Sequence, residues 1–146
     1  MSLSLKEAVS IAEAVLSWSD AEETGSLTVV VLDTGGHPRV VMRDDESEFL
    51  RVDVALGKAW GALGMGVPSR LLAEKAPHFL DAIAVTSGGR VVPVPGGVIV
   101  RRDGEIVGAV GVSGDTAEVD EKAAVHGIEA AGLQADYGQV DEWRRP

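Results

Sequence analysis

Two spacings of apolar residues alternate along this chain. Across residues 5–16 apolar side chains recur every three or four positions, Leu5, Val9, Ala12 and Leu16 among them, which predicts an amphipathic helix. An S-x-x-E capping pattern precedes it. The β-branched run at 27–33 and the shorter run at 39–43 then predict a hairpin around the turn sequence TGGHP.

The remaining segments continue this alternation. Helical patterns occupy 49–65, 69–75, 77–83 and 115–131, and strand-like runs occupy 91–94, 98–102 and 105–112. Because the short connections between strands read as hairpins, we expect an α+β fold in which helices flank an antiparallel sheet of about five strands. We expect one domain over residues 1–133 and a polar, aromatic tail over 134–146.

Composition then narrows the class of protein. The 146 residues are 45% hydrophobic and include no cysteine, which excludes disulfide scaffolds, zinc–thiolate sites and cysteine nucleophiles. Thirteen basic residues face 23 acidic ones, so the net charge of −10 repels nucleic-acid phosphates and anionic lipids. We therefore expect no nucleic-acid and no membrane partner. Without a signal-peptide pattern or a membrane-length apolar run, we expect a cytoplasmic protein.

Motifs for catalysis and metal binding are sparse. The sequence holds no G-x-S-x-G elbow and no H-x-x-x-H pair, and each of His37, His78 and His126 stands alone, so a structural or exposed role is the more frequent outcome for them. The segment 113–116 joins a strand to a helix, where free amides bind anions. The negative charge of Asp115 at that position favours a helix cap instead.

The stretch 93–121 is the most distinctive part of the sequence. It reads PVPGGVIVRRDGEIVGAVGVSGDTAEVDE. In its glycine pair, its D-G turn and its V-G-A-x-G-V-S-G run it resembles the GlcG/HbpS family, which includes the C-terminal domain of PduO-type proteins. The segments VLDTGG at 31–36 and A-x-x-K-A-x-x-A at 55–62 also agree with family motifs. The resemblance covers about residues 5–132.

The resemblance implies a profilin-like three-layer α/β/α arrangement. It also implies binding of haem or a corrinoid, sometimes haem breakdown, and assembly into a homo-oligomer. The chain departs from the family pattern at Ile99, where proline is usual, and at 42–45, where a glycine is lost. Its first helix carries no histidine. An axial haem ligand would thus come from His37, His78, His126, a methionine or a hydroxyl.

A ligand pocket is expected around Lys58, with Gly96 and Gly97 allowing close approach of a ligand. Arg43 is the candidate partner of a carboxylate. Ser113 and Thr116 offer hydroxyl groups. The alternative is that Lys58 is a solvated helix residue and that the glycines serve turns and close packing.

Three functions follow from these patterns. The first is a small-ligand-binding protein for haem or another tetrapyrrole. The second is an enzyme acting on a small carboxylate or aromatic metabolite, with Lys58 polarising a carbonyl and Asp33 moving a proton. The third is an assembly protein, with subunit contacts through the small-residue helix 55–64 and the strand near Val91.

Overall fold

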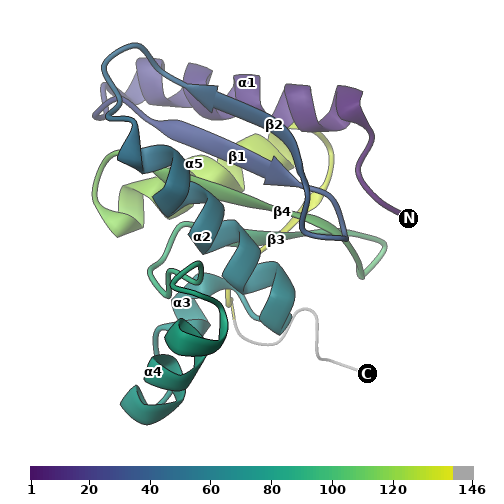
Figure 1. Ribbon diagram of the computed structural model, residues 1–146. Coiled ribbons are helices and arrows are strands. Elements are labelled where there is room, and N and C mark those ends of the chain that lie inside the picture. The colour runs from purple at the N-terminus through teal and green to yellow at the C-terminus, as the bar shows by residue number, and fades with distance from the viewer. Residues whose placement is uncertain (140–146) are drawn as a thin grey trace.

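The computed structural model describes residues 1–139 and contains a five-stranded antiparallel sheet between layers of helices (Figure 1). The strands are β1 (Thr28–Leu32), β2 (Pro38–Arg43), β3 (Gly97–Arg102), β4 (Glu105–Ser113) and β5 (Gln134–Asp136), in the sheet order β2-β1-β4-β3-β5. The helices are α1 (Leu5–Glu22), α2 (Leu50–Met65), α3 (Ser69–Leu72), α4 (Pro77–Thr86) and α5 (Ala117–Ala130). The expected α+β class is confirmed. Of the helices described, none combines the length and hydropathy that crossing a membrane requires.

The edge of the sheet differs from the prediction. The expected strand at 91–94 does not form, because Pro93 and Pro95 lack the N–H groups that a strand ladder needs and the segment runs along α2 instead. The fifth strand is instead β5, which lies in the predicted tail. It pairs with β3 through Ala135 and Val100. The remainder of the expected tail, 140–146, lies outside the described residues.

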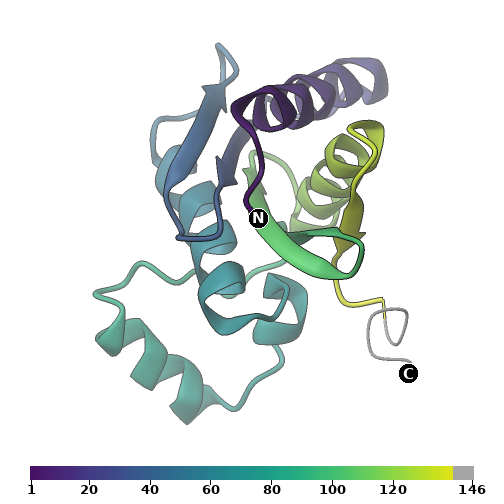
Figure 2. The same cartoon turned by 90° about the vertical axis from the view of Figure 1, so that its right-hand side faces the viewer.

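Helices α1 and α5 cover one face of the sheet, as Figure 2 shows. The capping box of Ser4 and Glu7 is formed as predicted. The buried side of α1 is shifted from the expected one: Ala12 is buried as expected, but Leu5 is 52% exposed, and the buried stripe also includes Ile11 and Val15. This stripe packs with α5 and alternate strand residues in an aliphatic core. That core is large enough to make this face the main source of apolar burial.

Helix α2 lies against the opposite face at unusually short range. There the sheet presents Gly97, Ile99, Ala109 and Gly111, alternating with the valines of the other face. A Cβ on Gly111 would clash with the backbone carbonyl of Ala55. Ala55 and Ala59 thus contact the sheet of their own chain, while Gly57 and Gly61 contact Val92 and Val91. The expectation that the small-residue helix forms subunit contacts does not hold for these four residues.

Candidate ligand-binding site

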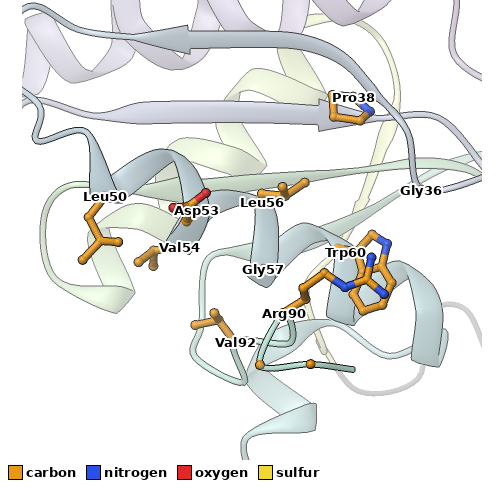
Figure 3. Close-up of a pocket in the computed structure, with 12 residues that line it drawn as sticks. Gly36, Pro38, Leu50, Asp53, Val54, Leu56, Gly57, Trp60, Arg90 and Val92 are labelled. Carbon is orange, nitrogen blue, oxygen red and sulfur yellow. The ribbon is translucent and has the colours of Figure 1, made fainter. Parts of the chain in front are cut away.

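A pocket of about 540 Å³ opens on the side of α2 that faces away from the sheet (Figure 3). It lies between the β1–β2 turn and the segment that leads from α4 to β3. Its lining comprises Gly36, Pro38, Leu50, Asp53, Val54, Leu56, Gly57, Trp60, Gly88, Gly89, Arg90 and Val92. This volume is typical of sites for small organic molecules and cofactors.

Glycines bring the walls of the pocket together. A Cβ on Gly57 would lie 2.6 Å from the carbonyl oxygen of Arg90, so only glycine lets this segment lie on α2. Val92 N–H donates to the carbonyl of Gly57 at 3.2 Å and fixes the contact. After α4 the chain reverses through Gly88 and Gly89, whose φ values of +65° and +79° favour glycine. These turns place Arg90 beside α2.

Trp60 and Arg90 form the central feature of the site. The guanidinium carbon of Arg90 lies 4.0 Å from the centre of the Trp60 ring, a cation–π contact, and its Nε donates to the carbonyl of Ser87 at 3.0 Å. Both side chains also line an adjoining pocket of about 380 Å³ between α2 and α4. Asp53 is the other charged residue of the larger pocket; it is exposed and, within residues 1–139, forms no ion pair. The pocket therefore holds one cation over an aromatic face and one free carboxylate.

Lys58 does not face this pocket. Its side chain is 3% exposed and its Nζ donates to Asp120 Oδ2 at 3.0 Å and to the carbonyl of Val112 at 2.9 Å. The other carboxylate oxygen of Asp120 accepts from the N–H of Asp115 at 2.9 Å. Burial lowers the pKa of Lys58 and raises the pKa of Asp120, while the attraction between the two opposes both shifts. The alternative of a solvated Lys58 is excluded, because the side chain is buried and paired with Asp120. This ion pair joins α2 to α5.

Gly96 and Gly97 lie beside Lys58, as the expected ligand pocket around Lys58 required. A Cβ on Gly96 would lie 2.9 Å from Lys58 Nζ, and one on Gly97 would clash with the carbonyl of Lys58. The space next to these glycines is thus filled by the lysine itself. The three residues form a closed, packed cluster, which supports close packing as the reason for the glycines.

The other predicted binding residues are scattered around this cluster. Ser113 is buried and its Oγ accepts from Arg51 Nη1 at 3.1 Å. Thr116 is the N-cap of α5 and accepts from the N–H of Val119 at 3.2 Å, so the helix-cap interpretation of 113–116 is confirmed. Arg43 donates to the carbonyl of Ser47 at 2.5 Å. Like Lys58, none of the three lines the Trp60 pocket.

The histidines occupy three separate parts of the surface. His37 lies in the β1–β2 turn between two residues that line the pocket, and its Nδ1 is 3.4 Å from Asp33 Oδ1. His78 is exposed at the start of α4, and His126 on α5 lies beside Trp18 on the opposite face. Only His37 adjoins the pocket. Residues 1–139 contain no group of three or more side chains arranged to hold a metal ion.

Asp33 has a structural role in the same turn. Its carboxylate accepts from the N–H groups of Gly35 at 2.9 Å and His37 at 3.0 Å. The bond from His37 is the main reason that the pKa of Asp33 lies below its ordinary value. Its acceptor capacity is used to shape the hairpin that forms one rim of the pocket.

Trp60, Arg90 and Asp53 were not predicted as site residues. The one available signal was a tryptophan within a glycine-rich helix, because a large side chain beside small ones marks an uneven helix surface. Arg90 follows two glycines in a turn, and nothing local distinguishes it from other surface arginines. Their proximity depends on how the α4–β3 segment returns to α2.

Comparison with known proteins identifies the family of this chain. A model of the family described as "Haem degrading protein HbpS-like" matches residues 3–129, and the chain therefore belongs to that family.

The chain is also similar to curated proteins. The uncharacterized 15.0 kDa protein in the dhaT-dhaS intergenic region of Citrobacter freundii is 34% identical over 96 residues, which are 64% of this chain and 68% of that protein. The corrinoid adenosyltransferase PduO of the same organism is 26% identical over 136 residues, which are 92% of this chain but 40% of PduO. The chain thus spans less than half of that relative.

Solved structures share the fold. The protein ORFY of Klebsiella pneumoniae superposes with a TM-score of 0.82 at 27% identity, covering 89% of this chain and 90% of that one. HbpS gives a TM-score of 0.75 at 25% identity, covering 87% and 88%. A PduOC:heme complex gives a TM-score of 0.85 at 24% identity, covering 93% and 99%, and at this identity it shows the fold alone.

Proposed function

We propose that this chain is a small-ligand-binding protein and that its ligand is haem or another tetrapyrrole, held in the pocket beside Trp60. The observation that carries the proposal is the stacked Trp60–Arg90 pair in the wall of a pocket of about 540 Å³. Membership of a family described as haem-degrading and HbpS-like supports the ligand class.

The chemistry of the pocket suits a flat ring system with carboxylate arms. The apolar side chains of Leu50, Val54 and Val92 remove apolar ligand surface from water. The indole of Trp60 stacks on a flat conjugated ring. Arg90 offers donors for a carboxylate, because a guanidinium matches that group with two parallel hydrogen bonds.

The iron of haem is matched less well than its ring. Histidine, cysteine, methionine and tyrosine are the usual ligands of haem iron, and none lines the pocket within the described residues. His37 adjoins the pocket from the turn, where its side chain is 80% exposed. The pocket thus fits the ring and its acidic arms without a lining ligand for the metal.

Titration with hemin tests the proposal. We expect saturable binding to the full chain at one hemin per site, with Trp60→Leu and Arg90→Gln each weakening it about tenfold, equivalent to about 1.4 kcal/mol. His126→Ala is the matched control, since it removes an exposed ring on the opposite face. Binding that never saturates, or that the Trp60 and Arg90 variants leave unchanged, would refute the proposed site.

An enzyme acting on a small carboxylate or aromatic metabolite is the second candidate. It is favoured by the presence of an acid, Asp53, and a carboxylate-binding cation, Arg90, in one pocket. Lys58 is engaged by Asp120 and does not reach this ligand. Turnover of a metabolite that Asp53→Asn abolishes would favour the enzyme over the binding protein.

We also propose a cytoplasmic homo-oligomer in which α4 contacts a second copy. All ten residues of α4 retain some exposure, and Val85 is 82% exposed although the helix is mostly apolar. The helix contributes one carboxylate, Asp81, to a chain of net charge −10, so two acidic copies repel each other only weakly through this helix. Light scattering should give a multiple of 15.2 kDa for the native chain, reduced by Val85→Glu; a native monomer at high concentration would contradict this.

A further inference from the structure

The two charged side chains of the pocket lie at opposite ends of its floor. Figure 3 shows Asp53 beside Leu50 and Val54 at one end and Arg90 over Trp60 at the other. Along α2, Asp53 precedes Trp60 by about two turns, or about 10 Å. A ligand that satisfies both therefore needs an acidic group at one end and a hydrogen-bond donor at the other.

Asp53 is the feature that haem leaves without a partner. Its carboxylate accepts hydrogen bonds and donates none when ionised. In haem, the four ring nitrogens bind iron and carry no hydrogen, and the peripheral carboxylates repel Asp53. In an open-chain, metal-free tetrapyrrole most of the four nitrogens carry hydrogen, and no metal occupies them. That class offers Asp53 a donor and still offers Arg90 a carboxylate.

The lining residues agree with a ligand that lacks iron. None of the side chains that line this pocket within residues 1–139 is of the kinds that usually hold haem iron. His37, the nearest histidine along the chain, has its Nδ1 3.4 Å from Asp33. A metal-free ligand leaves no coordination position unfilled in such a pocket.

We infer that this pocket selects an open-chain, metal-free tetrapyrrole over haem, with Asp53 accepting from a pyrrole N–H and Arg90 pairing with a propionate. The inference rests on the proposed function, since it specifies which member of the tetrapyrrole class the same site prefers. Asp53 is the residue that determines this preference, and Trp60 supplies the stacking surface that both ligands share.

Parallel titrations with biliverdin, protoporphyrin IX and hemin test the inference, read by absorption and by quenching of tryptophan fluorescence. We expect biliverdin to bind at least about tenfold more tightly than hemin. Asp53→Asn should weaken biliverdin about ten- to a hundredfold, the range expected for a hydrogen bond to a charged group, and should not weaken hemin, because the charge that repels its carboxylates is removed. The matched control is Asp20→Asn, an exposed carboxylate on α1 at the opposite face, which should change neither.

The other outcomes distinguish failure of the inference from failure of the proposed function. If hemin binds more tightly, with a coordinated Soret band that His37→Ala removes, the inference is overturned and the tetrapyrrole function stands. If biliverdin and protoporphyrin IX bind equally and Asp53→Asn has no effect, the preference for an open chain is overturned. If no tetrapyrrole saturates the site, both proposals fail. Circular dichroism of Asp53→Asn, whose altered side chain is exposed, shows whether the variant is folded.

Discussion

The two faces of the sheet are covered in opposite ways. On one face, α1 and α5 rest on branched aliphatic side chains such as Val29 and Val110, which fill the space between helix and strand. On the other, α2 lies over Gly111 and Ala109 so closely that a single added methyl group would meet its backbone. The first face is a conventional core; the second is a close contact that turns the far side of α2 into the floor of a pocket.

The difference shows how a small domain divides stability from binding. Apolar burial on the α1–α5 face follows from side-chain volume, so it tolerates hydrophobic substitutions of similar size. The α2 face depends on backbone proximity at glycines, where a side chain would clash, and on the buried Lys58–Asp120 pair, which loses stability when one partner is removed. Substitutions on the α2 face should therefore change the position of α2 as well as the stability of the fold.

The ion pair provides the largest test of this contrast. Lys58→Met or Asp120→Asn alone should lower the free energy of unfolding by about 3–5 kcal/mol, because each leaves the other charge buried without its partner. The double variant should lose less than the sum, since both charges are gone and the amide oxygen still accepts from Asp115. Urea unfolding at pH 7 measures the cycle; strictly additive losses would contradict a coupled pair.

Truncation of Ile11 tests the conventional face. The side chain is fully buried between α1, α5 and the sheet, so Ile11→Ala should cost about 2–5 kcal/mol through lost burial and the cavity that remains. Ligand affinity of the folded variant should stay as in the native chain. A loss of affinity comparable to that of Trp60→Leu would show that the two faces are not independent.

Addition of one methyl group tests the close face. Gly111→Ala should lower the free energy of unfolding by about 1–3 kcal/mol or more and weaken ligand binding, because α2 must move away from the sheet. Gly64→Ala in the facing helix α2 is the matched control: nothing lies within 4 Å of its added Cβ, so the variant should gain about 0.5–1 kcal/mol. Equal effects of both would exclude close packing as the cause.

The smallest expected effect concerns acid stability. Asp115 accepts from the N–H groups of Gly25 and Thr116, both at 2.7 Å, and the bond from Gly25 in particular holds the pKa of Asp115 below its ordinary value. A carboxyl whose pKa is lowered by folding stabilises the protein at pH values above its pKa in the unfolded chain, which is about 3.8. This contribution is lost as the pH falls through the lower pKa of the folded protein.

The melting temperature of Asp115→Asn should therefore lie below that of the native chain at pH 6, and the gap should narrow toward pH 3. Thermal unfolding followed by circular dichroism measures this. A difference in melting temperature that stays constant from pH 6 to pH 3 would show that the charge of Asp115 does not stabilise the fold.

Local signals account for the elements that were predicted correctly. The capping box at Ser4, the hairpin around Gly36 and the Asp-Gly turn at 103–104 are short-range patterns whose geometry depends on neighbours in sequence. The strand expected at 91–94 does not form. The prediction gave its β-branched residues more weight than Pro93 and Pro95. Strand β5 was missed because three residues carry too little periodicity to be recognised.

The sequence by itself determined the α+β class, most helix and strand positions, the family motifs and an acidic, cysteine-free composition. Tertiary structure decided that Lys58 is an internal partner of Asp120, and that Trp60, Arg90 and Asp53 share one pocket. The physical reason is range. Caps and turns are set by hydrogen bonds within a few residues, whereas a pocket forms where distant segments meet, and here backbone contact through glycines determines that meeting.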